Sequence, residues 1–444
     1  MNPIVLKFGG TSVVDAIAMR QVFTIINNDI PKIVVSSACS GITDALISLL
    51  NFAADNQTYP MYEKLEFIDN HHRKVIEDLF NSSDIYNQVT ARYNEIFNEL
   101  KKYIESIHFL NEKTQKSIDK VVSFGEIFST TILHYYCISQ GIKSIWLDAR
   151  KFIKTDSNFT AANIQFDLSK SKLQNQLAEN NFDEIKLAIT QGFIGSDLYN
   201  TTTTLGRGGS DYSAALIGKM INADEIQIWT DVDGILSADP RIVQYAHTIP
   251  QMEFNEVRQL AFFGAKVLHP NTLLPAIEQG IPIKVLNTFN PENKGTTILN
   301  TIQDNSLCLH SVVHLQTKRI DFPLASVDNF VGKSAEILHF FAKSKIYFSS
   351  ITPEGMSIWA ENNFDAKSEI TAEIDFQEFE NVNLIAITGK NINNQNVEKI
   401  NEIVGNNSAI IIFISNRNNL IIIEQIGDKD IDLLQKINDL IRMK

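Results

Sequence analysis

The sequence predicts an α/β protein of two or three domains. Its 444 residues exceed the length of a typical single domain. Strand-like and helix-like segments alternate over the first 300 residues, a pattern typical of a largely parallel sheet flanked by helices. Hydrophobic residues make up 44% of the chain and charged residues 20%, which are the proportions of a soluble globular protein.

The charge and the cysteine content argue against several classes of protein. A formal net charge of -13 argues against general nucleic-acid binding, which requires a basic face. No apolar run reaches membrane-spanning length, and the first residues lack a signal sequence. The three cysteines lie far apart, so we expect neither a disulfide framework nor a zinc site. We therefore expect a cytoplasmic protein with no nucleic-acid or membrane partner.

The first part of the chain alternates strands with helices. Residues 44 to about 120 carry apolar residues at three- and four-residue spacing, which predicts a helical insertion on the sheet. The composition changes near 295–306, which we interpret as a linker. Short apolar, β-branched runs predict the strands, at 4–8, 32–37, 143–147, 186–190, 226–230 and 282–286.

The last part of the chain predicts two small βαββαβ-like units. This repeat is one of structure rather than of sequence. The first unit is predicted to contain strands 307–317 and 319–325, helix 332–343, and strands 346–351 and 355–360. The second is predicted to contain strand 383–388, helix 394–404, strands 408–415 and 418–425, and helix 428–442.

The first strand leads into a motif suited to phosphate. Lys7 lies in a core strand, where a lysine costs free energy unless its ammonium is paired or reaches a polar cleft. Gly9 and Gly10 let a ligand approach the backbone, and the following Thr-Ser suits a helix N-terminus, which favours an anion. The alternative is a strand-end lysine that reaches solvent before a glycine turn. No GxxxxGK[ST] sequence occurs, so the motif is not a Walker motif.

Two further segments present polar groups next to predicted elements. In "VVSSACSGITD" (34–44) a strand runs into small and hydroxylic residues, with Thr43 as the expected helix N-cap. Open α/β sheets bind ligands at such strand ends, although an ordinary serine-rich turn is the alternative. In "SFGEIFST" (123–130) Glu126 either caps the start of an apolar helix or holds a substrate ammonium.

Three later segments add charged residues in glycine-rich turns. In "TTTTLGRGGSDYSAAL" (201–216) Arg207 suits the capture of a carboxylate or phosphate, with a flexible solvent loop as the alternative. The turns of "IWTDVDGILSADPR" (228–241) are suited to wrapping a nucleotide. Their acids fit no EF-hand spacing, so we expect no metal site made by the protein alone. In "FGAKVLHP" (263–270) Lys266 follows a glycine at an expected helix-to-loop position.

Together these segments favour phosphoryl transfer. They supply two lysines, an arginine, a carboxylate and several glycine-rich turns, and no Ser-His-Asp or Cys-His set is apparent. Phosphoryl transfer needs mostly positioning and charge neutralisation, which these residue types provide.

The motifs resemble those of aspartate kinase, a family within the amino-acid kinase superfamily. They stand in that family's order as "KFGGTSV", "SFGE", "TQGFIGS", "TTTLGRGGSDYSAAL", "IWTDVDGI", "DPR" and "GAKVLHP". The resemblance covers about residues 3–300, and the tail resembles the paired ACT domains of the same enzyme. It implies a catalytic domain over 1–298, an open sheet flanked by helices, and a tandem interleaved ACT region of α+β, ferredoxin-like units over 307–444. We expect the monofunctional form, without a fused homoserine dehydrogenase.

The resemblance implies ATP-dependent phosphorylation of the β-carboxylate of L-aspartate to 4-phospho-L-aspartate, at the head of lysine, threonine and methionine synthesis. It assigns catalytic roles to Lys7, Asp211 and Lys266. It assigns aspartate binding to Ser37, Thr43, Glu126, Arg207 and Ser210. It assigns nucleotide binding to Lys7, Gly9, Gly10, Thr230, Asp231, Leu236, Asp239, Arg241 and Lys266. The implied cofactors are ATP and Mg²⁺, with the magnesium carried by the ATP phosphates and no metal ligand from the protein.

The tail departs from the family's lysine-sensitive pattern. Gly332, Lys333 and Ser334 stand where that pattern has a glycine-aromatic-leucine step, and Ser349 stands where it has an aspartate. Glu354 is the nearby acid. The second helix of this first ACT unit looks shortened. We therefore expect an altered effector site, together with a homodimer formed through the ACT region.

Two alternatives stay open at this point. One is a kinase of the same fold for another acid, such as glutamate, acetylglutamate or carbamate. The other is an amino-acid sensor with an inactive kinase domain. The helical insertion and the ACT tail count against the first, and the complete set of charged motif residues counts against the second.

Overall fold

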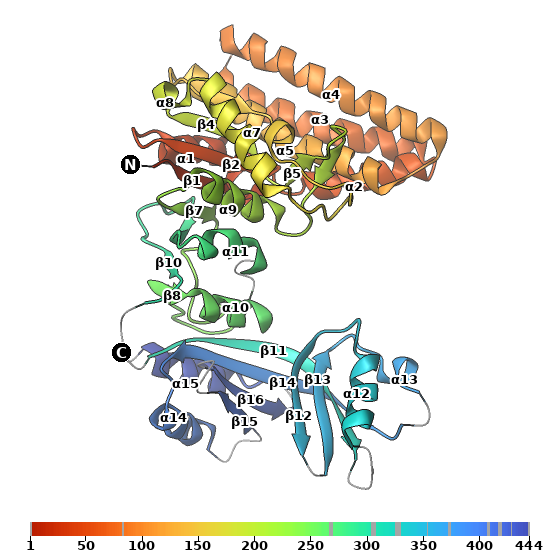
Figure 1. Ribbon diagram of the computed structural model, residues 1–444, viewed down its shortest axis with the longest axis vertical. Coiled ribbons are helices and arrows are strands. Elements are labelled where there is room, and N and C mark those ends of the chain that lie inside the picture. The colour runs from red at the N-terminus through yellow and green to blue at the C-terminus, as the bar shows by residue number, and fades with distance from the viewer. Residues whose placement is uncertain are drawn as a thin grey trace. The chain divides into compact units, whose positions relative to one another are not determined.

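The computed structural model describes residues 2–81, 84–265, 270–302, 308–324, 330–352, 354–371, 374–405, 409–415, 420–427 and 429–442 (Figure 1). It divides into two compact units. The first comprises Met1–Ile235, Pro250–Met252 and His269–Asn300, and the second comprises Leu236–Ile249, Glu253–Leu268 and Thr301–Lys444. No helix in the described ranges is both long enough and apolar enough to cross a membrane.

The first unit contains a sheet whose described strands run in the order β3-β4-β2-β1-β7-β9-β10-β8. The pairs from β3 to β9 are parallel, and β10 is antiparallel to β9. The strands are β1 (Ile4–Phe8), β2 (Lys32–Ser36), β3 (Ile145–Leu147), β4 (Leu187–Gln191), β7 (Ile226–Thr230), β8 (Gln251–Glu253), β9 (Ile283–Asn287) and β10 (Thr296–Leu299). The central strands are buried almost throughout, as is typical of parallel strands covered on both faces, and this explains their continuous apolar sequences.

Helices flank this sheet and confirm the predicted α/β class. Among them, α5 packs on β2, β3 and β4, while α9 packs on β1, β2 and β7. A short hairpin of β5 (Ile194–Ser196) and β6 (Thr202–Thr204) lies beside both helices. The helical elements are η1 (Gly10–Val13), α1 (Ala16–Ile26), α2 (Ile42–Ala54), α3 (Thr58–Phe80), α4 (Asp84–Leu110), α5 (Gln115–Ser139), α6 (Ala149–Phe152), α7 (Phe166–Glu179), α8 (Phe182–Ile185), α9 (Gly209–Ile221) and α11 (Pro270–Glu278).

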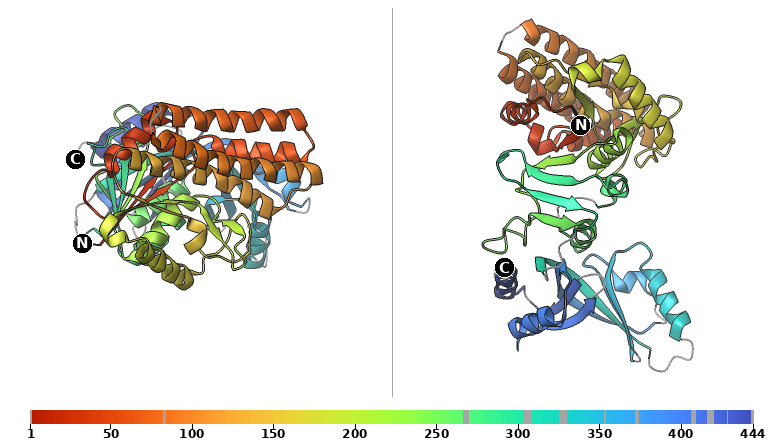
Figure 2. Two further views of the ribbon diagram at one scale, coloured as in Figure 1. Left: turned by 90° about the horizontal axis from the view of Figure 1, so that it is seen from above. Right: turned by 60° about the vertical axis from the view of Figure 1, so that its left-hand side comes forward.

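The predicted helical insertion is a group of long helices. α2, α3, α4 and α5 pack against one another, and Figure 2 shows the long helices lying side by side. The buried residues of α4 recur every three or four positions, so one stripe of the helix faces its neighbours. α5 extends well beyond the predicted end of the insertion near 120, and its second half runs along the sheet.

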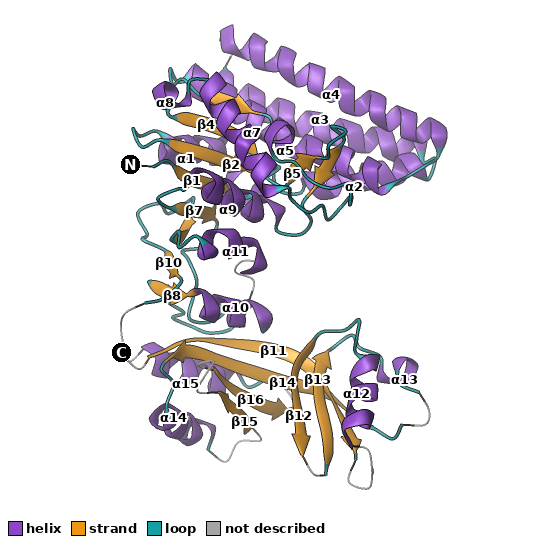
Figure 3. Ribbon diagram, viewed as in Figure 1, coloured by secondary structure: helices purple, strands orange, loops and turns teal. Residues whose placement is uncertain are grey.

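The second unit contains an antiparallel sheet whose described strands run in the order β12-β13-β11-β14-β16-β15 (Figure 3). The strands are β11 (Cys308–Pro323), β12 (Ile346–Thr352), β13 (Gly355–Glu361), β14 (Gln377–Lys390), β15 (Ala409–Ser415) and β16 (Leu420–Ile426). The helices are α12 (Phe330–Phe340), α13 (Ala366–Glu369), α14 (Asn394–Val404) and α15 (Ile431–Arg442), together with α10 (Phe254–Phe262) from earlier in the chain. The helix α13 has only four residues, as expected for a shortened second helix in the first predicted βαββαβ-like unit.

One part of the strand prediction for the tail is wrong. The two predicted strands at 307–317 and 319–325 form the single strand β11. Its pairing with β14 shifts register between Thr317 and Arg319, so a bulge stands where the sequence suggested a break. Because the long strands β11 and β14 pair along their length, the two predicted repeats share one continuous sheet.

Candidate active site

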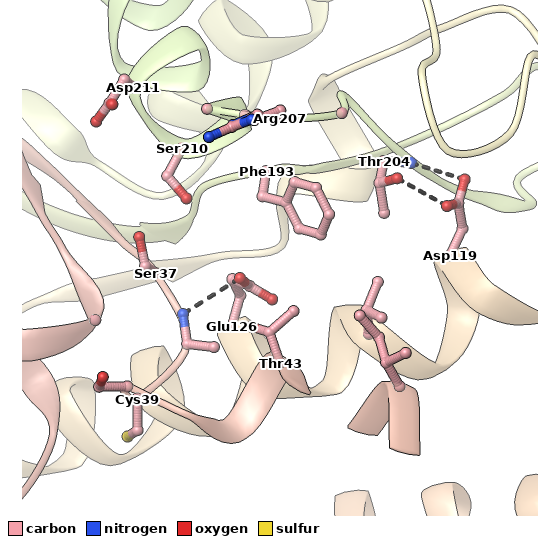
Figure 4. Close-up of a pocket in the computed structure, with 18 of the residues that line it drawn as sticks. Ser37, Cys39, Thr43, Asp119, Glu126, Phe193, Thr204, Arg207, Ser210 and Asp211 are labelled. Atoms are coloured by element: carbon pink, nitrogen blue, oxygen red, sulfur yellow. Dashed lines mark hydrogen bonds between the residues drawn. The ribbon is translucent and has the colours of Figure 1, made fainter. Parts of the chain in front are cut away.

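A pocket of about 540 Å³ lies in the first unit, beside the ends of β1 and β2 (Figure 4). Parallel strands that end beside helix N-termini are the usual ligand sites of open α/β sheets. Predicted site residues from four separate parts of the chain line this pocket. They are Lys7, Gly10, Ser37, Thr43, Glu126, Arg207, Ser210 and Asp211.

Lys7 and Asp211 form an ion pair at the edge of this pocket. Lys7 Nζ lies 2.8 Å from Asp211 Oδ1, and the two side chains are only 12% and 14% exposed. Asp211 is in the first turn of α9, where a helix N-terminus stabilises a negative charge. The ammonium of Lys7 is therefore held at the pocket by a buried carboxylate, which excludes the alternative of a strand-end lysine that simply reaches solvent.

Glu126 lies in the interior of α5 and is not a helix cap. The helix begins at Gln115 and is capped by Thr114, whose side chain accepts a hydrogen bond from the Ser117 amide. The prediction that Glu126 stands at the start of a helix, together with its capping alternative, is therefore wrong. The interior position remains suited to a ligand, because the side chain lines the pocket.

The surroundings of the Glu126 carboxyl group favour binding of a cation. Its side chain is buried, and Oε1 accepts a hydrogen bond of 3.2 Å from the Ala38 amide. Its second oxygen, Oε2, has no hydrogen-bond partner among the described residues. Burial raises the pKa of Glu126 to about 8. A ligand ammonium beside Oε2 would satisfy this oxygen and lower the pKa.

Arg207 faces the pocket from a loop in which it stands between two glycines. Gly206 and Gly208, on either side of Arg207, have φ values of 76° and 72°, in the left-handed region that favours glycine. Arg207 is exposed and lines the pocket, and in Figure 4 it lies on the opposite side from Glu126, with Phe193 between them. The loop thus presents a guanidinium to the pocket and is more than a solvent loop.

Ser37 and Thr43 come to the pocket from the strand–helix connection after β2. The Ser37 amide donates to the Phe8 carbonyl at 3.1 Å, and the Ser37 carbonyl accepts from Ser129 Oγ at 2.7 Å. The prediction that Thr43 is the N-cap of the next helix is wrong, because Gly41 occupies that position with φ 80°. Thr43 lies in the first turn of α2 and still lines the pocket.

Sequence reasoning missed Asp119, a buried residue of α5 that also lines the pocket. Its two carboxylate oxygens accept hydrogen bonds from the Thr160 amide, at 3.1 and 2.9 Å. They also accept from the Thr204 amide at 2.9 Å and from Thr204 Oγ1 at 2.7 Å (Figure 4). Its position seven residues before Glu126, on the same face of a helix, could have indicated that Asp119 lines the pocket. An acidic residue in a helix is usually exposed to solvent, however, so this spacing alone is a weak indication.

Phe193 is a second pocket residue that sequence reasoning missed. Its φ is 67°, an uncommon value for a bulky residue, and its amide donates to Ser213 Oγ at 2.9 Å. Phe193 also explains a neighbouring glycine. A Cβ added at Gly209 would lie 2.6 Å from the Phe193 ring. The start of α9 therefore packs tightly against this aromatic side chain.

The structure does not gather all the predicted nucleotide residues in one unit. Thr230 and Asp231 lie at the end of β7 in the first unit, with Thr230 Oγ1 3.2 Å from Asp231 Oδ1. Leu236, Asp239 and Arg241 belong to the second unit.

Within that second unit, Asp239 and Arg241 form a local ion pair. Arg241 donates to both oxygens of Asp239 at 3.0 and 2.6 Å, and these hydrogen bonds lower the pKa of Asp239. Lys266 lies outside the described residues.

Gly9 and Gly10 lie where β1 ends, beside Lys7. A Cβ added at Gly9 would lie 3.6 Å from Lys7 Nζ, in ordinary van der Waals contact. A Cβ added at Gly10 would lie 2.9 Å from the Ala38 carbonyl oxygen. Close packing of two backbone segments is thus one reason for Gly10.

The predicted regulatory residues lie in the second unit. Gly332, Lys333 and Ser334 are in α12, and Lys333 Nζ is 3.0 Å from Glu336. Ser349 is exposed on β12. Glu354 is exposed beside the start of β13, and a hydrogen bond from Thr352 lowers its pKa.

Comparison with known proteins identifies relatives over most of the chain. Residues 2–287 match the amino acid kinase family. The chain is 34% identical to lysine-sensitive aspartokinase 3 of Escherichia coli, over 80% of this chain and 77% of that protein. It is 36% identical to an aspartokinase of Chlamydia pneumoniae, over 67% of this chain and 63% of that protein. Its structure resembles E. coli aspartokinase III in complex with lysine and aspartate, with a TM-score of 0.81, 26% identity and 99% of both chains covered.

Proposed function

The chain belongs to the amino acid kinase family and, within it, to the aspartokinases, and on this premise we propose how its residues phosphorylate aspartate with ATP. The pocket binds L-aspartate, and the γ-phosphoryl group of ATP is transferred to the β-carboxylate to give 4-phospho-L-aspartate. One observation carries the proposal: Glu126 and Arg207 line the same pocket as the Lys7–Asp211 ion pair. Aspartate has an ammonium group and two carboxylates, which match these charges.

The two ends of the amino acid are bound by groups of opposite charge. The Glu126 carboxylate pairs with the substrate ammonium, and the Arg207 guanidinium pairs with the α-carboxylate, for which its planar donors are suited. Pairing with the ammonium stabilises the charged form of Glu126 and so offsets the desolvation that raises its pKa. Ser37, Thr43 and Ser210, which line the pocket, supply hydroxyl donors to the substrate carboxylates.

The transfer step uses the β-carboxylate itself as the nucleophile. One of its oxygens forms a bond to the γ-phosphorus while the bond from that phosphorus to the bridging oxygen of ADP breaks. No protein nucleophile is required, and the protein contributes positioning and charge neutralisation. Lys7 neutralises charge on the transferring group, and Asp211, 2.8 Å from Lys7 Nζ, holds the ammonium in place. Lys266 is proposed to add a second positive charge.

The nucleotide lies beside the same strand ends. Gly9 and Gly10 follow Lys7 closely enough for phosphates to meet both backbone and ammonium. Thr230 and Asp231, with Leu236, Asp239 and Arg241, are proposed to hold the rest of ATP. In the described ranges no three acidic, histidine or cysteine side chains gather as they would to hold a metal. We therefore propose that Mg²⁺ enters with ATP, bound by its phosphates and by water.

The second unit is proposed to regulate the enzyme and to pair two copies of the chain in the cytoplasm. β12 is an edge strand of its sheet, and an edge strand presents backbone groups that a second copy can pair with. An amino-acid effector binds this region near Lys333, Ser349 and Glu354. The product, 4-phospho-L-aspartate, is proposed to be a precursor in the synthesis of lysine, threonine and methionine.

The test is a hydroxamate assay with ATP, magnesium and a panel of acids. We expect turnover with L-aspartate and not with glutamate, acetylglutamate or carbamate. Arg207→Ala and Glu126→Ala should each raise KM for aspartate far more than KM for ATP, whereas Arg92→Ala, a surface control on α4, should change neither. Preference for another acid, or no turnover despite amino-acid binding, would support one of the alternatives. Weaker ATP binding with unchanged aspartate binding would assign the 205–211 loop to the nucleotide.

A further inference from the structure

A second cavity of the first unit is lined mainly by cations. Its volume is about 410 Å³, and it shares no lining residue with the active-site pocket. We call it the basic cavity. α5, α7, the segment around α6, and the β5–β6 hairpin contribute its walls. Its charged lining residues are Lys120, Asp148, Arg150, Lys151, Lys154 and Lys172.

Lys154 is the buried member of this set. It is 5% exposed, and its Nζ donates to Ser196 Oγ at 2.7 Å and to Asn200 Oδ1 at 3.1 Å. Both acceptors are neutral, so these hydrogen bonds leave the positive charge uncompensated. In the described part of the chain no carboxylate forms an ion pair with it. Burial and the charge of Lys172 lower the pKa of Lys154, while the charges of Asp197 and Asp148 oppose this shift.

The other cations divide into two kinds. Lys120 and Arg150 already have partners, since Lys120 Nζ is 2.6 Å from Glu99 and Arg150 donates to both oxygens of Asp148, at 2.9 and 2.7 Å. Lys151 and Lys172, like Lys154, form no ion pair with any residue in the described ranges. After these pairings the cavity keeps an excess of positive charge. A buried, unbalanced ammonium costs free energy, and an anion in the cavity would offset that cost.

We propose that the basic cavity binds a phosphate group, held by Lys154 and Lys172 with Lys151 at the exposed side. A phosphate carries nearly two negative charges at neutral pH and has three strong acceptor oxygens, which suits several lysine ammonium groups. Asn200 Oδ1 is the atom that accepts from Lys154, so the side-chain NH₂ group of Asn200 is a further potential donor to the phosphate. The volume admits either inorganic phosphate or the phosphate of a small metabolite.

Some residues of the basic cavity are close in sequence to residues of the active-site pocket, so the experiment must distinguish binding at the two sites. Lys120 directly follows Asp119, and β6 carries both Thr202 of the basic cavity and Thr204 of the active-site pocket. The full chain is therefore first saturated with aspartate and a non-hydrolysable ATP analogue. Inorganic phosphate, and separately glycerol 3-phosphate, are then titrated by calorimetry at constant ionic strength. The result does not depend on the proposed roles in catalysis.

We expect saturable binding of at least one probe, with a Kd in or below the millimolar range. Lys172→Gln should weaken binding at least about tenfold, as loss of one charge-assisted hydrogen bond does. Lys101→Gln removes the same charge from an exposed position on α4 and should leave Kd unchanged. Lys154→Gln, checked for folding by circular dichroism, should weaken binding further. Tighter binding of glycerol 3-phosphate would indicate a metabolite, and tighter binding of inorganic phosphate would indicate the free anion.

Two results would overturn the proposal. One is no saturable heat with either probe up to about 50 mM, a concentration at which even a weak site is filled. The other is equal affinity in the wild type, Lys172→Gln and folded Lys154→Gln proteins. In that case the anion binds somewhere else on the chain.

Discussion

Two lysines in neighbouring strands show how different surroundings give one residue type different roles. Lys7 on β1 meets a carboxylate at the pocket. Lys32 on β2 is 1% exposed and donates to the carbonyls of Ile26 and Asn28, at 3.0 and 2.6 Å. Burial lowers the pKa of Lys32 to about 8. Lys32 thus satisfies carbonyls at the end of α1, whereas Lys7 is available to a ligand.

This contrast gives the first prediction. Lys7→Ala should lower kcat by on the order of 10²-fold or more, because it removes a preorganised charge needed most in the transition state. Lys32→Ala should lower the melting temperature but leave kcat of the folded enzyme within about twofold, because Lys32 is not a pocket residue. Steady-state kinetics and thermal unfolding of both variants test this. Near-normal turnover in folded Lys7→Ala would refute the role given to Lys7.

The raised pKa of Glu126, together with its proposed role, predicts that aspartate binding depends on pH. With the site empty its pKa is raised to about 8, so its carboxyl group is mainly protonated at neutral pH. Binding the substrate ammonium requires the carboxylate, and the amino group of free aspartate stays charged over this range. We therefore expect KM for aspartate to fall as pH rises from about 6 to 8 and to level off above that. Glu126→Gln should bind aspartate weakly, with little dependence on pH. A KM that is flat from pH 6 to 9 in the wild type would contradict this.

The same pKa also has a consequence for stability. Between the ordinary pKa of 4.5 and the raised value near 8, the folded protein holds a proton that the unfolded chain has lost. The contribution of Glu126 to the free energy of unfolding therefore falls as pH rises through this window. Without aspartate, the melting temperature of Glu126→Gln relative to wild type should be higher at pH 8.5 than at pH 6.

At the residue scale, the sequence predicted the charged residues proposed to meet the substrate better than the residues that hold the pocket in place. Lys7, Glu126, Arg207 and Asp211 were predicted and do line one pocket. Lys7 and Arg207 stand in local patterns that core packing does not require, whereas the resemblance to aspartate kinase assigned Glu126 and Asp211 to the site. Asp119 was not predicted. Its four hydrogen bonds come from residues 41 and 85 positions away, so no local sequence pattern predicts them.

At the scale of elements, α5 carries two of the three acidic residues that line the pocket. Asp119 and Glu126 are seven residues apart, about two helical turns, so they lie on one face. Glu126 accepts a hydrogen bond from the Ala38 amide, whereas Asp119 accepts hydrogen bonds from the amides of Thr160 and Thr204. Thr204 ends β6, directly before the loop that carries Arg207. α5 therefore fixes both sides of the proposed aspartate site, and Asp119 is a positioning residue.

Asp119→Asn should raise KM for aspartate by about tenfold while changing KM for ATP much less, because it replaces an acceptor beside two backbone amides with a group that also donates. Asp156→Asn is the control, because Asp156 also accepts backbone amides in the loop that contains Thr160 but does not line the pocket. Both variants should lose some stability. Equal effects on KM for aspartate and for ATP would show that Asp119 has only a structural role.

The strands of the tail show where local patterns fail. β11 was predicted as two strands divided at Lys318, next to Arg319, whereas the structure has a single strand there. These cations are instead satisfied across the sheet, since Lys318 pairs with Glu378 of β14 at 3.0 Å and Arg319 pairs with the buried Glu424 of β16. Partners 60 and 105 positions away are not visible in a local window.

At the scale of the whole molecule, the second unit includes a segment from the middle of the chain. Ala238 and Val243 belong to a buried cluster with residues of α14, α15 and β16. Ser237 Oγ donates to Asn438 Oδ1 at 2.8 Å, and the Gln244 amide donates to Gln435 Oε1 at 2.8 Å. This grouping was not predicted, because it depends on contacts about 190 to 200 positions apart. Residues proposed for the nucleotide thus pack in the unit proposed to bind an effector.

Two residues of the proposed effector region, Lys333 and Ser349, do not suit a lysine ligand. A lysine ligand has two ammonium groups, and a buried site must offer them carboxylate or carbonyl oxygens. Ser349 gives a hydroxyl where the resemblance led us to expect an acid in a lysine-sensitive enzyme. Lys333 adds a positive charge on α12, although Glu336 lies 3.0 Å from its ammonium. Glu354 is exposed, and a hydrogen bond from Thr352 already stabilises its charged form. These features disfavour a second cation, as specificity against a ligand often requires.

We therefore predict that lysine at millimolar concentration leaves the kinase activity unchanged. Inhibition requires that lysine bind an inactive state better than the active one, and the groups near Ser349 give it little affinity for either. The measurement is a titration of lysine, threonine, methionine and their pairs into the kinase assay, with the Ser349→Asp variant alongside. If the missing carboxylate is the cause, Ser349→Asp should gain inhibition by lysine, while Ser350→Asp, one residue along the same strand and facing the other side of the sheet, should not. Steep, cooperative inhibition of the wild type by lysine alone would show that the pocket obtains its anionic partner elsewhere.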